Sequence, residues 1–174
     1  MEPMPTPAAD VAADVVGALA ARGLTLATAE SLTGGGVGAL VTSVPGSSAV
    51  YVGGVIAYAS RLKVELLGVP DDVVERFGVV SARCARAMAA GVRRLGADVG
   101  VSTTGVAGPD PQEGKPAGLV YIAVADDAGE EVRELRLDGD RAAVRRSTAE
   151  AAMELLRDRM EESSGGMLAG GGSV

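Results

Sequence analysis

The order of strand-like and helical segments is the feature that most constrains the fold of this chain. Over the first two thirds of the sequence, short apolar segments alternate with segments of helical periodicity, and two strand-like segments then follow each other directly. Strands that are separated by helices pair in parallel, whereas two strands joined by a tight turn form an antiparallel hairpin. The sequence therefore predicts a single α/β domain of three layers, α/β/α, in which helices cover both faces of a mixed β-sheet.

The expected elements follow from hydrophobic periodicity and from glycine and proline stops. We expect strands at 24–29, 53–58, 99–104, 118–125 and 130–137, and helices at 8–22, 37–44, 60–67, 71–77, 81–95 and 141–161. Ser81 is the expected N-cap of its helix. The domain should span residues 8–161, between a flexible lead at 1–7 and a disordered tail at 162–174 that is rich in glycine and serine.

Composition excludes many familiar enzyme mechanisms. The chain has no histidine and one cysteine, Cys84. Histidine-dependent triads, thiolate zinc sites and an internal disulfide framework are therefore ruled out. We interpret Cys84 as a core residue of a helix, because nothing near it in the sequence would lower the pKa of its thiol. We expect neither a metal nor a cofactor.

Charge and hydropathy limit the possible partners. The formal net charge is −7 and the basic residues form no cluster, so a nucleic-acid partner is not expected. No apolar run reaches the ~20 residues that a membrane span needs. No signal peptide is visible at the N-terminus, and we therefore expect a cytoplasmic protein without a membrane partner.

Lysine is the residue type that could replace histidine as a base. Only two of the 16 basic residues are lysines, Lys63 and Lys115, and lysine can lose its proton when it is buried, whereas arginine cannot. Lys115 does not complete a phosphate-binding P-loop motif, because Pro116 follows it. Tyr58 and Lys63 follow the expected strand at 53–58, and Ser48 precedes that strand. These residue types permit an acyl-transfer site with a serine nucleophile and a lysine base, although their spacing does not establish one.

Residues 34–39, Gly-Gly-Gly-Val-Gly-Ala, fit the dinucleotide-binding pattern between a strand and a helix. The acidic residue that would bind a ribose is missing from the end of the next strand, so this interpretation is weak. Two others stay open. The glycines and the hydroxyls of Ser31 and Thr33 could bind an anion such as phosphate at the helix N-terminus, or the glycines could simply allow close packing around an ordinary capped helix.

Two further features have both a functional and a structural interpretation. Arg141 and Arg145 are four residues apart at the start of the last helix, so both guanidinium groups could hold one anion, or they could form a solvated face. Asp110, between Pro109 and Pro111, could be a turn residue or a carboxylate of the site.

Several segments taken together resemble a known family. They match, in order, over roughly residues 8 to 160, and the family is the C-terminal domain of CinA, which includes the nicotinamide-nucleotide amidohydrolases, here in their stand-alone form. The segments are Thr28–Gly35, Gly46–Ser48, Tyr58 with Lys63, Gly68–Val69, Gly78–Ser81, Thr104–Asp110, Lys115–Gly118, and Gly139–Arg141 with Arg145.

This resemblance implies a fold, a reaction and a site. The reaction would be hydrolysis of nicotinamide mononucleotide to nicotinate mononucleotide and ammonia, without a metal or cofactor, in a homo-oligomer. Ser48 would be the nucleophile and Lys63 its base, with Tyr58 beside them. The residues implied to frame the nucleotide and the oxyanion are Ser31, Thr33, Gly34, Gly35, Thr104, Gly105, Arg141 and Arg145.

An alternative within the same family is a non-catalytic nucleotide-binding or assembly module that lacks the chemistry. The presence of both Ser48 and Lys63 favours the enzyme. The sequence departs from the family pattern at Ala59-Ser60 and in the loop at 111–114, so we expect differences near Lys63 and in the loop over the substrate.

Overall fold

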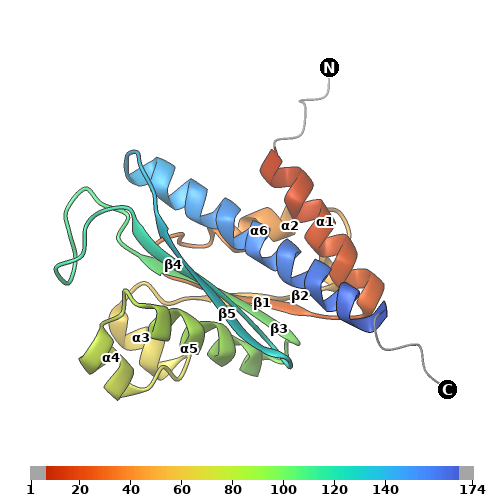
Figure 1. Ribbon diagram of the computed structural model, residues 1–174, viewed down its shortest axis with the longest axis horizontal. Helices are drawn as coiled ribbons and strands as arrows, with labels where there is room; N and C mark the ends of the chain where they lie inside the picture. The colour runs from red at the N-terminus through yellow and green to blue at the C-terminus, as the bar shows by residue number, and fades with distance from the viewer. Residues whose placement is uncertain (1–6, 169–174) are drawn as a thin grey trace.

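Five strands form a mixed sheet in the order β2-β1-β3-β4-β5 in the computed structural model, which describes residues 7–168 (Figure 1). β1 pairs in parallel with β2 and β3, whereas β4 is antiparallel to both β3 and β5. The mixed sheet predicted from the order of segments is confirmed. The strands are β1 (Leu26–Glu30), β2 (Tyr51–Ile56), β3 (Val99–Gly105), β4 (Leu119–Asp126) and β5 (Gly129–Arg136).

Helices cover both faces of the sheet, which confirms the three-layer α/β/α architecture. In Figure 1, α1, α2 and α6 lie on one side of the sheet, and α3, α4 and α5 lie on the other. Each layer buries its own apolar cluster, built mainly from valine, leucine, alanine and methionine. The helices are α1 (Pro7–Arg22), α2 (Gly36–Thr42), α3 (Ser60–Glu65), α4 (Asp71–Phe77), α5 (Ala82–Val92) and α6 (Arg141–Leu168), with the 3₁₀ turns η1 (Ser47–Ala49) and η2 (Arg93–Leu95).

The path of the chain makes β1 and β3 a topological switch point. After β1 the chain turns to β2 on one side, and it later returns to β3 on the other side. Because the three strands run in parallel, their carboxyl ends meet at the same edge of the sheet, where open α/β sheets bind ligands. Glu30, Ile56 and Gly105 end these strands.

Two sequence predictions about helix ends have different outcomes. Ser81 caps α5 as expected, because its side chain accepts a hydrogen bond from the Cys84 N–H. α6 continues to Leu168, beyond the expected end near 161. Extending an existing helix costs much less than starting one, so a long helix can run on into residues of low helix propensity. Residues 1–6 of the expected lead and 169–174 of the expected tail lie outside the described residues.

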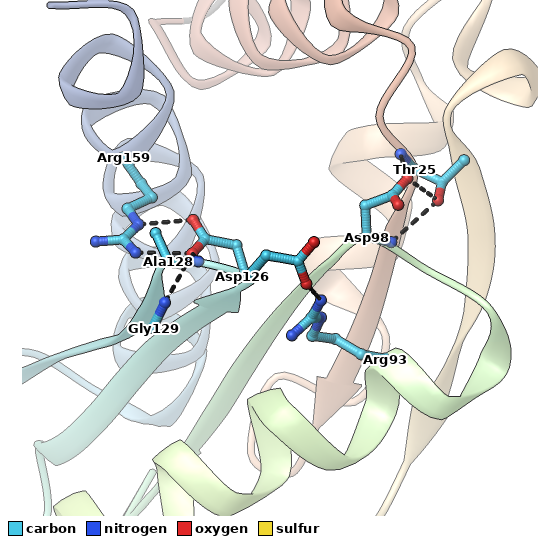
Figure 2. A network of polar contacts seen from close by, with 8 residues as sticks. Thr25, Arg93, Asp98, Asp126, Ala128, Gly129 and Arg159 are labelled. Atoms are coloured by element: carbon cyan, nitrogen blue, oxygen red, sulfur yellow. Dashed lines mark hydrogen bonds and ion pairs between the residues drawn. The ribbon is translucent and has the colours of Figure 1, made fainter. Parts of the chain in front are cut away.

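At the opposite end of the sheet, an ion pair ties the β4–β5 turn to α6 (Figure 2). Arg159 donates to both carboxylate oxygens of Asp126, at 2.8 Å each. The same carboxylate accepts the N–H groups of Ala128 and Gly129. Figure 2 also shows Asp98 bonded to Thr25, and Arg93 paired with the aspartate that follows Asp126.

We expect the Asp126→Asn variant to lose about 2 kcal/mol of stability near pH 7. The hydrogen bonds from Arg159 hold the pKa of Asp126 below its usual range, against the opposing effect of burial. The contribution of Asp126 is therefore present above the pKa of the unfolded state and is lost as the pH falls through the lower folded-state pKa. Urea unfolding of both proteins from neutral to acidic pH checks this, and a stability difference that stays constant on acidification would contradict it.

Candidate active site

A cavity of about 610 Å³ opens where β1, β2 and β3 end. In Figure 1, α3 and the start of α6 lie on opposite faces near this end of the sheet, and the long loop between β3 and β4 extends from the same end. Six of the residues that the sequence predicted for the site line the cavity, and they come from segments far apart in the chain. They are Ser31, Tyr58, Lys63, Thr104, Gly105 and Arg141.

Lys63 and Ser31 form a buried pair that lines this cavity. Lys63 lies in α3 and is only 1% exposed, and Ser31 directly follows β1 and is 8% exposed. The Lys63 Nζ lies 3.0 Å from the Ser31 Oγ and 2.7 Å from the carbonyl oxygen of Ala57, and it donates to both. A hydroxyl and an amine are thus within the distance of a direct proton transfer.

Burial makes Lys63 a better base than an ordinary lysine. Desolvation lowers the pKa of Lys63, and the Coulombic effects of Cys84 and Glu113 oppose this shift. Burial also raises the pKa of the Cys84 thiol to about 11. Cys84 is therefore neutral near pH 7, so its Coulombic effect on Lys63 applies only at higher pH, and its interpretation as a buried core residue is confirmed.

The structure contradicts the expected pairing of Ser48 with Lys63. Ser48 is exposed and lies in η1, before β2, whereas Lys63 follows the far end of β2. A strand rises about 3.3 Å per residue, so the six residues of β2 put roughly 20 Å between the two ends. Within one chain, Ser31 and not Ser48 is the hydroxyl that contacts Lys63.

The glycine-rich turn is not an open anion site, and this also corrects an expectation. The carboxylate of Glu30, which is 2% exposed, already occupies the N-terminus of α2. It accepts hydrogen bonds from the Thr33 hydroxyl at 2.6 Å and from backbone N–H groups at 2.8–3.0 Å. A Cβ on Gly38 would lie 2.7 Å from the Tyr51 hydroxyl, so the glycine permits this close packing. The donors are Gly35, Val37 and Gly38.

Thr33, Gly34 and Gly35 consequently do not line the main cavity. The Thr33 hydroxyl is engaged with Glu30, and the Gly35 N–H is engaged with the same carboxylate. The capped-helix interpretation of the turn is the one that the structure supports, with Glu30 as the unexpected capping group.

The two arginines of α6 do not converge on one point. Arg141 donates to the carbonyl oxygen of Gly108 at 2.8 Å and to the Tyr58 hydroxyl at 2.9 Å, and it lines the main cavity. Arg145 instead donates to the carbonyl oxygens of Leu32 and Thr33, beside a second cavity of about 300 Å³. Of the two interpretations of this pair, the shared anion site is therefore not supported, and Arg141 is the arginine that a ligand in the main cavity would meet.

Two backbone segments that matched the family, but to which no role was assigned from the sequence, complete the cavity wall. Val79 and Val80 are apolar and carried no chemical signal, yet Val79 accepts a hydrogen bond from the Thr104 hydroxyl at 2.7 Å. Residues 106–112 form the other segment, and the Thr104–Asp110 motif and the altered loop at 111–114 had pointed to it. Asp110, which the sequence left open as a turn residue or a carboxylate of the site, lies among these lining residues.

Comparison with known proteins identifies the family. A sequence model of the CinA C-terminal domain matches residues 8–160. The chain belongs to the CinA C-terminal domain family. This result confirms the resemblance that was drawn from the short motifs.

Relatives in other bacteria are similar to this CinA domain but longer. A CinA-like protein of Frankia casuarinae is 49% identical over 144 residues, which cover 82% of this chain and 33% of that protein. A CinA-like protein of Synechocystis is 48% identical over 160 residues, which cover 88% of this chain and 38% of that protein. The chain thus spans between a third and two fifths of the length of these two relatives.

Solved structures of CinA proteins have the same fold. A CinA superfamily protein from Klebsiella pneumoniae superposes with a TM-score of 0.86 at 32% identity, covering 90% of this chain and 99% of that one. A competence/damage inducible protein from Agrobacterium tumefaciens gives a TM-score of 0.85 at 33% identity, covering 92% and 99%.

Residues 7–168 offer neither a metal cluster nor a membrane-spanning helix. No cluster of three or more His, Cys, Asp or Glu side chains in this part of the CinA domain could hold a metal ion. None of its helices combines the length and the apolar character needed to cross a membrane.

Proposed function

We propose that this CinA domain is an amidohydrolase that converts nicotinamide mononucleotide to nicotinate mononucleotide and ammonia. The observation that carries the proposal is the buried Lys63 amine, 3.0 Å from the Ser31 hydroxyl in a cavity of a histidine-free chain. Amide hydrolysis needs a nucleophile and a base, and this pair supplies both. The substrate comes from the family resemblance of the motifs around the cavity.

In the proposed reaction, neutral Lys63 accepts the proton of the Ser31 hydroxyl as the Oγ attacks the carboxamide carbon. The tetrahedral intermediate then collapses, the carbon–nitrogen bond breaks, and the proton on Lys63 passes to the departing nitrogen to form ammonia. A water molecule, deprotonated by Lys63, attacks the resulting ester of Ser31. Nicotinate mononucleotide leaves, and the proton returns to Ser31.

The oxyanion of the intermediate needs hydrogen-bond donors near Ser31. Within residues 7–168, the backbone N–H of Leu32 makes no hydrogen bond to another protein group. This N–H belongs to the residue that follows the nucleophile, a position that often supplies an oxyanion donor. We assign it that role.

We expect Arg141 to bind the phosphate of the substrate. Arg141→Ala should raise the KM for nicotinamide mononucleotide by about 10- to 100-fold, the value of one or two charge-assisted hydrogen bonds, and change little for the phosphate-free riboside. Arg146→Ala, which removes an exposed arginine of the same helix outside the main cavity, is the matched control. Steady-state ammonia release with both substrates measures this. An equal KM increase for the riboside would exclude the phosphate role.

Ammonia release from nicotinamide mononucleotide by the unmodified chain tests the proposed function. We expect product to accumulate well above the rate seen with a Lys63→Met variant. Saturable binding of the nucleotide without ammonia release would instead favour the non-catalytic binding module.

A further inference from the structure

The turn formed by residues 112–115 has an unusual backbone for its sequence. Gln112 and Lys115 exchange backbone hydrogen bonds of 3.0 and 2.8 Å, so the chain reverses over Glu113 and Gly114. Both central residues have a positive φ, of 52° and 70°. Among the described residues, Glu113 is the one non-glycine residue in this left-handed region, which costs on the order of 1 kcal/mol for a residue with a Cβ. Such strain persists only where other contacts hold the residue in place.

The contacts that hold Glu113 reach a distant part of the chain. Its carboxylate accepts hydrogen bonds from the N–H groups of Val79 at 3.1 Å and Val80 at 3.2 Å. Lys115 donates to the carbonyl oxygens of Phe77 and Val80 and lies 3.4 Å from the Glu113 carboxylate. These contacts therefore tie the turn to the segment between α4 and α5.

A glycine at position 78 is needed for this close approach. A Cβ on Gly78, which has a φ of 78°, would lie 2.4 Å from a carboxylate oxygen of Glu113. No larger residue fits there without moving the carboxylate.

The segment between α4 and α5 that the turn contacts forms a wall of the active-site cavity. Val79 and Val80 are buried and line the cavity, and the carbonyl oxygen of Val79 receives the hydrogen bond of the Thr104 hydroxyl. A continuous series of contacts thus runs from Glu113 through Val79 to Thr104, at the carboxyl end of β3.

The charge of Glu113 also opposes the effect of burial on Lys63 and favours its protonated form. Hydrogen bonds from Val79 and Val80 and the charge of Lys115 lower the pKa of Glu113 against the effect of burial, so it is ionised at neutral pH. The other groups around Lys63 are Ser31, the Ala57 carbonyl and the neutral Cys84 thiol, with Tyr58 and Arg141 lining the same cavity.

We propose that Glu113 is a positioning residue of the Ser31–Lys63 site, whose carboxylate fixes the Val79–Val80 wall and whose negative charge acts on Lys63. This inference rests on the proposed function. The charge of Glu113 matters after Lys63 has taken the proton of Ser31. Lys63 must then stay protonated until it delivers the proton to the departing nitrogen. Burial favours the base form of Lys63, and Glu113 favours its acid form.

The two lysines of the chain allow a direct test. With ¹³Cε-labelled lysine, NMR titration of the whole chain should give one signal for each lysine, and Lys115→Met leaves only that of Lys63. We expect Glu113→Gln to move the titration midpoint of Lys63 to lower pH, in both the wild-type and the Lys115→Met background. Lys115→Met alone keeps the carboxylate, so it should not move the midpoint of Lys63 downward.

Kinetics supply the second readout. The acidic limb of the pH profile of kcat should move to lower pH in Glu113→Gln but not in Lys115→Met, with a loss of maximal kcat of about tenfold or more from the loosened wall. If the turn at 112–115 only supported folding, both variants would lose activity alike and neither would shift the Lys63 titration.

The NMR result does not depend on catalysis, so it separates this proposal from the proposed function. A folded Glu113→Gln variant with an unshifted Lys63 titration would overturn the proposal even if the enzyme is active. If Glu113→Gln does not fold, Glu113→Asp and Lys115→Met decide. Lys115→Met keeps the carboxylate, so a downward shift of the Lys63 midpoint in that variant would contradict the proposal. Glu113→Asp withdraws the carboxylate by one methylene, so an unchanged midpoint in that variant would contradict it.

Discussion

Replacement of Lys63 by methionine is expected to lower kcat for nicotinamide mononucleotide by about 10³-fold, the middle of the range for a general acid–base residue. Methionine fills a similar volume in the buried site but cannot accept or deliver a proton. The KM should change much less, because Lys63 acts on the Ser31 hydroxyl and not on the phosphate. Ammonia release at saturating substrate measures the effect.

Two observations accompany this prediction. Arg61→Met, which removes an exposed cation of the same helix, is the matched control and should keep nearly full activity. In the unmodified enzyme, kcat should rise with pH through the pKa of Lys63, which burial holds below the ordinary lysine range. Near-normal turnover by Lys63→Met would make Lys63 only a structural group and would leave Ser31 without its base.

Replacement of Glu30 by alanine is expected to destabilise the fold by about 3–5 kcal/mol, the cost of leaving several buried donors without an acceptor. The Glu30 carboxylate is buried and accepts four hydrogen bonds at the start of α2. Glu30→Gln keeps the shape but loses the charge, so its loss should be smaller. Urea unfolding at neutral pH gives the free energies.

Glu65→Ala provides the comparison for this experiment. Glu65 is an exposed glutamate whose ion pair with Arg61 lies at the surface. Its removal should change stability by less than about 1 kcal/mol. Equal losses for Glu30→Ala and Glu65→Ala would show that the carboxylate does not hold the turn together.

The fold could be predicted from the sequence because the signals that end its helices and strands are local. Glycine and proline stops mark most element ends within a few residues, and the Ser81 cap acts over three residues. The end of α6 was placed too early, because glycine and serine weaken a helix without forcing it to stop where it is already long.

The site could be predicted only in part. Tyr58, Lys63 and Thr104 were found because their types and motifs carry chemistry, and the cavity brings them together. Ser48 was matched by a motif, but the chain order does not reveal that β2 separates it from Lys63. Glu30 was missed as a helix cap because its bonding partners become visible only once the turn is folded. The homo-oligomer stays a prediction.

The most direct test of the Ser31–Lys63 site compares two serine variants in the same ammonia-release assay. Ser31→Ala should lose about 10³-fold or more in kcat, as expected for removal of a nucleophile. Ser48→Ala, at an exposed position before β2, should stay within about threefold of the unmodified enzyme. An active Ser31→Ala variant beside an inactive Ser48→Ala variant would contradict the account.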